Sequence, residues 1–261
     1  MVNNGQETAM PEVKEYEPGT PSWVDLGSPD IDASVAFYGG LFGWAFESAG
    51  PVEETGGYGM FTLDGKNVAG LGPQMNPDQP PYWTMYVSVA DIEATAARVE
   101  AHGGTIVVPP MEVMTAGKMG VFVDSVGAAV SGWQPIEHIG AQIVNEPGSF
   151  CWSELRTADV GPAFGFYERV FNWVANSIEM DATPYTLWQI GDRPIAGMMG
   201  DPDAPSRWET TFAVADCDAA VAKAVELGGS VAHAAVDSSA GRYAILVDPH
   251  GAGFGVIALA S

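Results

Sequence analysis

The sequence predicts an α+β protein made of four βαβββ modules in two tandem repeats. The stretch TPSWVDLGSPDIDASVAFYGGLFGW at residues 20–44 returns later as SFCWSELRTADVGPAFGFYERVFNW, with Trp152 placed 129 residues after Trp23. A second stretch, PYWTMYVSVADIEATAARVEAHGG from Pro81, returns from Ser206 as SRWETTFAVADCDAAVAKAVELGG, 125 residues later. Because long self-similarity marks a repeated structural unit, we interpret the chain as one unit used twice.

Each module begins with a strand followed by a helix. In Ser22–Leu26, apolar and polar residues alternate as they do in a half-buried strand. Ser28 and Pro29 then provide a helix start signal, with Ser28 as the expected N-cap. The apolar stripe of the helix consists of Ile31, Val35, Tyr38 and Phe42, and Gly43 ends it.

Short strands complete each module. In the first they are expected at Trp44–Ser48, Met60–Leu63 and Asn67–Leu71, with a hairpin turn at Asp64–Gly65. The second module starts with the strand Tyr82–Val89 and a helix capped by Asp91. Its remaining strands are expected at Thr105–Val108, Gly120–Asp124 and Ala128–Gln134.

These patterns divide the chain into four segments. Residues 1–19 form a flexible acidic tail, 20–137 the first repeat, 138–148 a linker and 149–261 the second repeat. The N-terminal residues have neither a basic start nor an apolar run, so they do not read as a signal peptide. Since the two repeats can pair with each other inside one chain, we expect a monomer or a weak homodimer.

Charge and cysteine content narrow the class of function. With 33 acidic and 10 basic residues, the net charge is −23, which argues against nucleic acid as a partner. It favours cationic small molecules, although a solvated acidic surface alone would also explain it. The apolar runs are shorter than the roughly 18 residues of a membrane span. Cys151 and Cys217 occupy non-equivalent repeat positions, which favours reduced thiols and a cytoplasmic location.

The motifs FYGGLFGW, VSVADIEA and VDPHG, within the fourfold βαβββ order, resemble the vicinal oxygen chelate superfamily. This group includes glyoxalase I, extradiol dioxygenases and bleomycin-binding proteins. The resemblance implies two curved β-sheet half-barrels with helices outside. More closely, PSWVDL, FYGGLFGW and HIGAQIVNEPG resemble a tandem-repeat, glyoxalase-like subgroup. Some of its members accompany oxygenases in aromatic polyketide pathways, including anthracycline pathways.

The resemblance also implies four metal-ligand positions in each cleft. These positions fall on Trp23, Gly70, Thr84 and Ser131, and in the second repeat on Trp152, Gly197, Glu209 and Gly255. Of these side chains only Glu209 is a good ligand for a divalent ion, and one carboxylate does not hold a metal. We therefore expect no metal and no other cofactor.

In this family a first-type module usually shares a cleft with a second-type module of another repeat. Cleft A would then contain Trp23, Asp25, Gly70, Glu209, Thr211 and Gly255. Cleft B would contain Trp152, Glu154, Gly197, Thr84, Tyr86, Ser131 and Trp133. The glycines predict wide clefts, and a tryptophan beside a carboxylate suits a flat ring with an amine. Alternatively, the tryptophans fill the clefts as ordinary core.

Three functions remain open. The first is a metal-independent binding protein for an aromatic, cationic secondary metabolite, serving sequestration, resistance or a partner oxygenase of the pathway. The second is a metal-independent isomerase, cyclase or hydroxylase component. Its catalytic candidates are Asp25, Glu154 and Glu209, because paired carboxylates in an apolar cleft separate their pKa values and act as acid and base. The third is a glyoxalase-like lyase, whose chemistry requires the missing metal.

Overall fold

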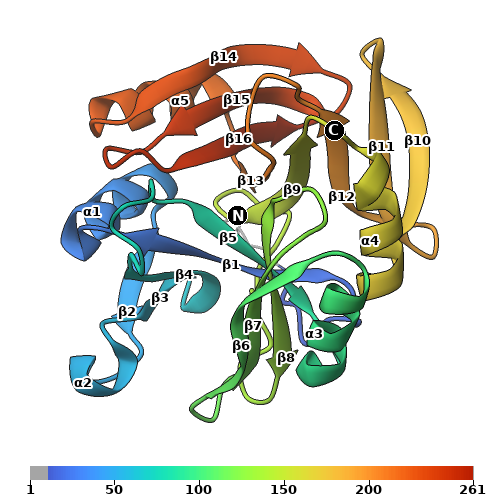
Figure 1. Ribbon diagram of the computed structural model, residues 1–261. Helices are drawn as coiled ribbons and strands as arrows, with labels where there is room; N and C mark the ends of the chain where they lie inside the picture. Colours follow the sequence, from blue (N-terminus) through green and yellow to red (C-terminus); the bar gives the residue numbers. More distant parts are fainter. Residues whose placement is uncertain (1–10, 261) are drawn as a thin grey trace, which may run out of the picture.

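A computed structural model describes residues 11–260 and shows two eight-stranded sheets with helices packed on one face of each (Figure 1). The first sheet has the order β2-β3-β4-β1-β5-β8-β7-β6 and the second the order β10-β11-β12-β9-β13-β16-β15-β14. The strands of the first are β1 Pro21–Ser28, β2 Ala45–Ser48, β3 Gly59–Leu63, β4 Lys66–Pro73, β5 Trp83–Ser88, β6 Thr105–Val113, β7 Gly117–Val123 and β8 Ala129–Pro135. Those of the second are β9 Phe150–Thr157, β10 Val174–Met180, β11 Thr183–Ile190, β12 Arg193–Gly200, β13 Arg207–Ala213, β14 Ser230–Ser238, β15 Gly241–Val247 and β16 Gly253–Leu259. The predicted α+β fold of four βαβββ modules is confirmed.

Three of the helices in the described residues begin at an aspartate whose carboxylate caps the first turn. The helices are α1 Ile31–Phe42, α2 Val52–Thr55, α3 Ile92–Ala101, α4 Gly161–Phe171 and α5 Cys217–Glu226. The N-cap of α1 is Asp30, whose carboxylate accepts a hydrogen bond from the Ala33 amide at 3.0 Å, and not Ser28 as predicted. Ser28 Oγ hydrogen-bonds instead to the backbone of Asp30 and to Ser34. Gly43 ends α1 with a positive φ of 76°, as its position after the stripe predicts.

Each sheet is continuous within one repeat. Strand β1 pairs antiparallel with β5, which places Trp23 opposite Tyr86 and Asp25 opposite Thr84. The same arrangement in the second repeat pairs β9 with β13. The expected pairing of modules across repeats is therefore wrong for the sheets, because both middle strands of each sheet come from the same repeat.

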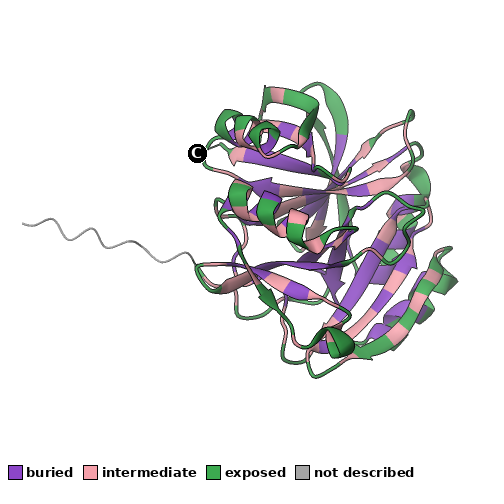
Figure 2. Cartoon of the chain, turned by 90° about the vertical axis from the view of Figure 1, so that its left-hand side faces the viewer, coloured by how far each residue is buried: buried purple, intermediate pink, exposed green. Residues whose placement is uncertain are grey.

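The hydrophobic cores, in contrast, are shared between the repeats. Helix α1 lies beside α5, and α3 lies beside α4 (Figure 1). In the first core Phe42 and Trp44 pack on Phe212 of the second repeat, with ring centroids 5.2 and 5.4 Å apart. In the second core, Met85 and Phe122 of the first repeat share one cluster with residues of α4. Figure 2 shows the buried residues concentrated on the strands in the interior of the molecule, whereas the helices also carry exposed residues.

Two equivalent hydrogen-bonded triads cross the junction inside these cores. Tyr167 Oη donates to Asp124 Oδ2 at 2.6 Å and accepts from Trp208 Nε1 at 2.7 Å. The counterpart of Tyr167, Tyr38, donates to the Asp248 carboxylate at 3.1 Å. Since each tyrosine and its aspartate belong to different repeats, these triads join the halves by buried polar contacts as well as by apolar packing.

Part of the expected tail and the linker pack against the first repeat. The Val13 amide donates to Gln142 O at 2.9 Å, and Tyr16 Oη donates to Ala141 O at 2.7 Å. The Ala141 amide in turn donates to Ser22 O of β1 at 2.8 Å. Within the expected flexible tail, residues 11–19 are therefore anchored to the fold, while residues 1–10 lie outside the described residues.

None of the helices in the described residues is both long and apolar enough to cross a membrane. Cys151 and Cys217 are free thiols, and Cys217 is buried at the start of α5.

Candidate functional site

The predicted site residues all lie on the central strands of the two sheets, on the face turned away from the helices. We call these surfaces the first and second inner faces. The first contains Trp23, Asp25, Gly70, Thr84, Tyr86, Ser131 and Trp133. The second contains Trp152, Glu154, Gly197, Glu209, Thr211 and Gly255. The structure therefore brings together all the predicted residues of each repeat, and it separates Asp25 from Glu209, which were expected to share a cleft.

On the first inner face, one carboxylate accepts hydrogen bonds from two tyrosines. Tyr86 Oη donates to Asp25 Oδ2 at 3.0 Å, and Tyr58 Oη donates to the same oxygen at 3.2 Å. Trp23 Nε1 donates to Tyr58 Oη at 3.1 Å, which fixes the phenol between the indole and the carboxylate. Burial raises the pKa of Asp25 to about 6, while the bonds from Tyr86 and Tyr58 lower it.

Much of the first inner face is covered by the linker. The His138 ring lies 4.5 Å from Trp23, centroid to centroid, in an edge-on arrangement. Trp133 Nε1 donates to His138 O at 2.7 Å, and burial lowers the pKa of His138 to about 4, which keeps the imidazole neutral. Trp23 is only 3% exposed. The expected stacking of a ligand on Trp23 is therefore wrong, because the linker already occupies that position, and the alternative reading as core is correct for this tryptophan.

The second inner face repeats the tryptophan–tyrosine–carboxylate motif but is more open. Trp152 Nε1 donates to Tyr185 Oη at 3.0 Å, as Trp23 does to Tyr58. Trp152 is half-buried, and no aromatic ring pair among residues 11–260 involves it. Burial raises the pKa of Glu154, against the attraction of the neighbouring Arg156 guanidinium.

A chain of ion pairs crosses the second inner face. Arg156 Nε lies 2.6 Å from Glu154 Oε1 and 3.3 Å from Glu209 Oε2. Arg207 Nη2 lies 2.7 Å from the other oxygen of Glu209 and 3.1 Å from Asp201 Oδ2. Three carboxylates thus share two guanidinium groups, which leaves a net charge of −1 on a face that includes the half-buried Trp152 indole.

The three glycines of the inner faces do not widen them, contrary to the prediction. A Cβ at Gly70 would collide with Tyr58 Oη, and one at Gly197 would collide with Tyr185 Oη. A Cβ at Gly255 would collide with Thr211 Oγ1. In each case a neighbouring side chain fills the space that the glycine leaves.

Tyr58 and Tyr185 are functional candidates that sequence reasoning missed. They occupy equivalent positions, 127 residues apart, at the start of YGMFTL and YTLWQI. A tyrosine kept at one position in both copies was the available signal. Only the structure shows that the phenol of each tyrosine fills the space left by a glycine, Gly70 for Tyr58 and Gly197 for Tyr185.

The residues at the family's ligand positions do not fit a divalent ion. Within the described residues, no group of three His, Cys, Asp or Glu side chains is arranged to hold a metal. Glu209 is the one carboxylate at these positions, and Arg156 and Arg207 already pair with both of its oxygens. A metal there would have to compete with two guanidinium groups and would gain one ligand.

Solved structures share this architecture. The Mn(II)-bound glyoxalase from Novosphingobium aromaticivorans superposes with a TM-score of 0.64 at 14% identity, over 92% of this chain and 82% of that one. The 2,3-dioxygenase LapB from Pseudomonas sp. KL28 superposes with a TM-score of 0.65 at 12% identity, over 97% and 94%. At these identities the likeness defines the fold: paired half-barrels of βαβββ modules.

Sequence comparison then defines the family. The model of the Glyoxalase/Bleomycin resistance protein/Dioxygenase superfamily matches residues 20–131, and that of the Glyoxalase-like domain matches residues 152–257. The anthracycline biosynthesis protein DauV of Streptomyces sp. (strain C5) is 42% identical, over 94% of both chains. The putative glyoxylase CFP32 of Mycobacterium bovis is 41% identical, over 95% of this chain and 98% of its own. The chain belongs to the glyoxalase/bleomycin resistance protein/dioxygenase superfamily.

We expect the Asp25 carboxyl to titrate near pH 6 in the folded protein, where carbon-detected NMR of its carboxyl signal measures it. This folded pKa exceeds the ordinary value of about 3.9, so the folded state holds the Asp25 proton more tightly than the unfolded state does. The resulting contribution of Asp25 to the free energy of unfolding is complete below pH 4 and is lost as the pH rises through 6. Tyr86→Phe removes a hydrogen bond that favours the carboxylate, so it should raise this pKa further.

Tyr82→Phe is the matched control for that titration. The Tyr82 side chain is exposed and makes no hydrogen bond to Asp25 within residues 11–260. The pKa of Asp25 should therefore be the same in this variant as in the unaltered protein. An Asp25 pKa near 4 in the unaltered protein, or a lowered one in Tyr86→Phe, would contradict this description of the first inner face.

Proposed function

We propose that the protein binds a planar, cationic aromatic metabolite on the second inner face, without a metal ion. The observation that carries this proposal is the half-buried Trp152 beside an ion-pair chain with one carboxylate in excess. An amine on the ligand would balance the excess charge of Glu154 and Glu209, whose side chains remain 14% and 18% exposed. The indole would stack on the ring system.

Two relatives named as anthracycline biosynthesis proteins support an aromatic ligand from such a pathway. Anthracyclines combine a flat ring system with an amino sugar, which is the chemistry that an indole beside carboxylates recognises. The protein would sequester this compound or hold it for a partner oxygenase in the cytoplasm. The free thiols of Cys151 and Cys217 support that location.

The test is a titration with an anthracycline amine, followed by quenching of tryptophan fluorescence and by calorimetry. Micromolar or tighter binding is expected, and Trp152→Ala should weaken it about tenfold because stacking and cation–π contact contribute on the order of 1–3 kcal/mol. Glu209→Gln should weaken it less. Asp25→Asn is the matched control on the first inner face and should leave the affinity unchanged.

The same anthracycline with its nitrogen acetylated should bind several-fold less tightly. Added salt should weaken the binding of the amine and leave the binding of the acetylated compound unchanged. Equal binding of both compounds would show that the carboxylates do not recognise charge. If neither compound binds, the proposed ligand class is wrong.

A second candidate is a metal-independent acid–base enzyme centred on Asp25, as an isomerase, cyclase or hydroxylase component. Its specific support is the carboxyl pKa of about 6, which lets one group both accept and donate a proton near neutral pH. Tyr58 and Tyr86 would hold the carboxyl in place. Turnover separates the two candidates: a binding protein returns its ligand unchanged, whereas the enzyme converts it and loses activity in Asp25→Asn.

A further inference from the structure

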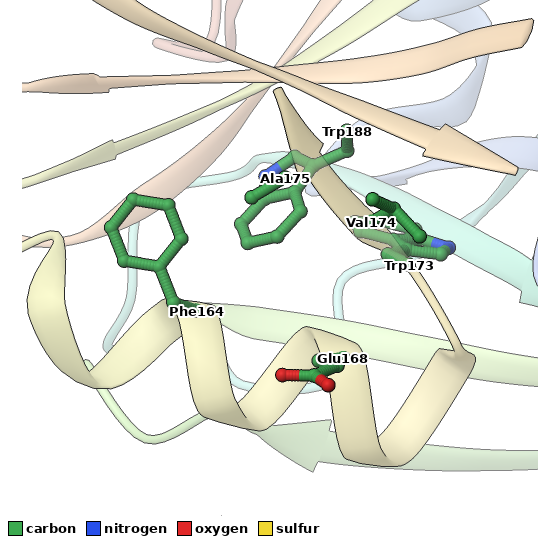
Figure 3. A pocket seen from close by; sticks show the side chains of 6 residues that line it. All are labelled: Phe164, Glu168, Trp173, Val174, Ala175 and Trp188. Carbon is green, nitrogen blue, oxygen red and sulfur yellow. The ribbon is translucent and has the colours of Figure 1, made fainter. Parts of the chain in front are cut away.

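A separate pocket of about 390 Å³ lies on the helix side of the second sheet, away from both inner faces (Figure 3). Helix α4 contributes one wall, and strands β10 and β11 contribute the other. It is lined by Phe164, Glu168, Trp173, Val174, Ala175 and Trp188. Glu168, Val174 and Ala175 are exposed and Phe164 is half-buried, whereas Trp173 and Trp188 lie fully buried beneath them. The accessible walls of the open pocket are therefore the Phe164 ring and the small apolar side chains of β10.

The internal repeat explains why this space is empty. In the first sheet Phe46 of β2 pairs with Phe61 of β3, and their ring centroids are 5.7 Å apart. At the equivalent pair of the second sheet, Ala175 stands opposite Trp188. The ring that fills the site in one copy is thus reduced to a methyl group in the other.

The helix side of the pocket compensates only in part. Phe164 stands at the position of Val35, and its ring lies 5.7 Å from that of Trp188. Phe164 therefore covers one edge of the Trp188 indole, and the space beside Ala175 remains. An open cavity next to close-packed rings forfeits dispersion contacts that a ligand would restore.

The polar groups of the pocket indicate which ligand suits it. Glu168 contributes the sole charge among the lining residues, where the first copy has Gly39. The Trp188 Nε1 donor is buried and has no hydrogen-bond partner in the described part of the chain. The half-buried Phe164 ring and the Glu168 carboxylate, both on α4, favour an aromatic organic cation, and the net charge of −23 works against an organic anion.

We propose that this pocket is a second binding site, for a compact arylalkylamine cation. The ring lies against Phe164 and Ala175, and the ammonium group pairs with Glu168. A volume of about 390 Å³ is at the small end of ligand pockets, which suits one or two rings and not the larger metabolite proposed for the second inner face. The two sites are independent.

The test uses 2-phenylethylamine as the probe, with calorimetry and saturation-transfer NMR as readouts. Its Kd should be on the order of a millimolar or tighter, given the limits on binding energy per atom for so small a ligand. The neutral 2-phenylethanol should bind about threefold less tightly, and phenylacetate more weakly still.

Ala175→Phe restores the ring that Phe46 provides in the first repeat, so it should weaken phenylethylamine binding at least tenfold without lowering the thermal stability. Ala175→Leu fills the pocket less completely and serves if the phenylalanine variant fails to fold. Glu168→Gln should reduce the amine to the affinity of the alcohol.

Trp152→Ala separates this site from the second inner face, and it should leave phenylethylamine binding intact. The proposal is overturned if the amine binds Ala175→Phe and Ala175→Leu as tightly as the unaltered protein. It is also overturned if Trp152→Ala removes the binding, or if 2-phenylethylamine and phenylacetate bind equally.

Discussion

Residues 20–137 expressed alone are expected to aggregate or self-associate, and so are residues 149–261. The reason is that each hydrophobic core contains residues of both repeats, so neither repeat alone forms a complete core. Removing the second repeat would expose Phe42 and Trp44, which pack on Phe212. The same cut would expose the first-repeat side of the second core, including Phe122. Large apolar surfaces of this kind drive association in water.

The measurement is size-exclusion chromatography with light scattering on each half, followed by mixing. Mixed halves should recover a one-to-one complex with the circular dichroism of the intact chain, because the two shared cores re-form. The intact chain should be monomeric in dilute solution. A half that stays monomeric with cooperative unfolding would contradict the shared-core description.

Tyr167→Phe should lower the free energy of unfolding by about 2 kcal/mol, the cost of leaving buried polar groups without partners. The hydroxyl donates to the buried carboxylate of Asp124 and accepts from the Trp208 indole. The phenylalanine ring still stacks on Trp173, whose centroid is 4.9 Å away, so the loss reports the hydroxyl and not the packing. Urea denaturation followed by circular dichroism measures it.

Tyr243→Phe is the matched control, since its half-buried hydroxyl makes no hydrogen bond within residues 11–260 while its ring stacks on His233. It should change stability by less than about 0.5 kcal/mol. Tyr38→Phe, in the equivalent triad, should resemble Tyr167→Phe. If Tyr167→Phe were as stable as the control, the triads would not hold the repeats together.

Local patterns predicted most elements to within a few residues, although the short helix α2 at Val52–Thr55 was not predicted. The Asp64–Gly65 turn is present, with positive φ at both residues, because few other pairs adopt that conformation at low cost. The misplaced helix start has a local cause: Ser28 and Asp30 are both good caps, and the carboxylate of Asp30 reaches the free amide of Ala33. Edge strands such as β6 extended further than predicted because a β-bulge continues the pairing past Val108.

The sequence predicted which strand residues share each inner face, but it did not predict which other side chains cover them. Alternation along β1 and β5 places Trp23, Asp25 and Tyr86 on one side of a sheet, and this follows from the period of a strand. That Tyr58 occupies the space over Gly70 does not follow from any local pattern. Tyr58 lies immediately before β3, and only the folded sheet brings its phenol to the Asp25 carboxylate.

By itself, the sequence determined the two repeats, the four βαβββ modules and the residues that face away from the helices. Only the tertiary structure decided that the sheets close within a repeat while the cores close between repeats. The physical reason is that the repeats are equivalent in pattern. Strands β5 and β13 have the same alternation of side chains along the chain. By period and register, β1 could therefore pair with either of them equally well. The choice depends on long-range packing, where the cross-repeat bonds of Tyr38 and Tyr167 and the linker over Trp23 distinguish the two arrangements.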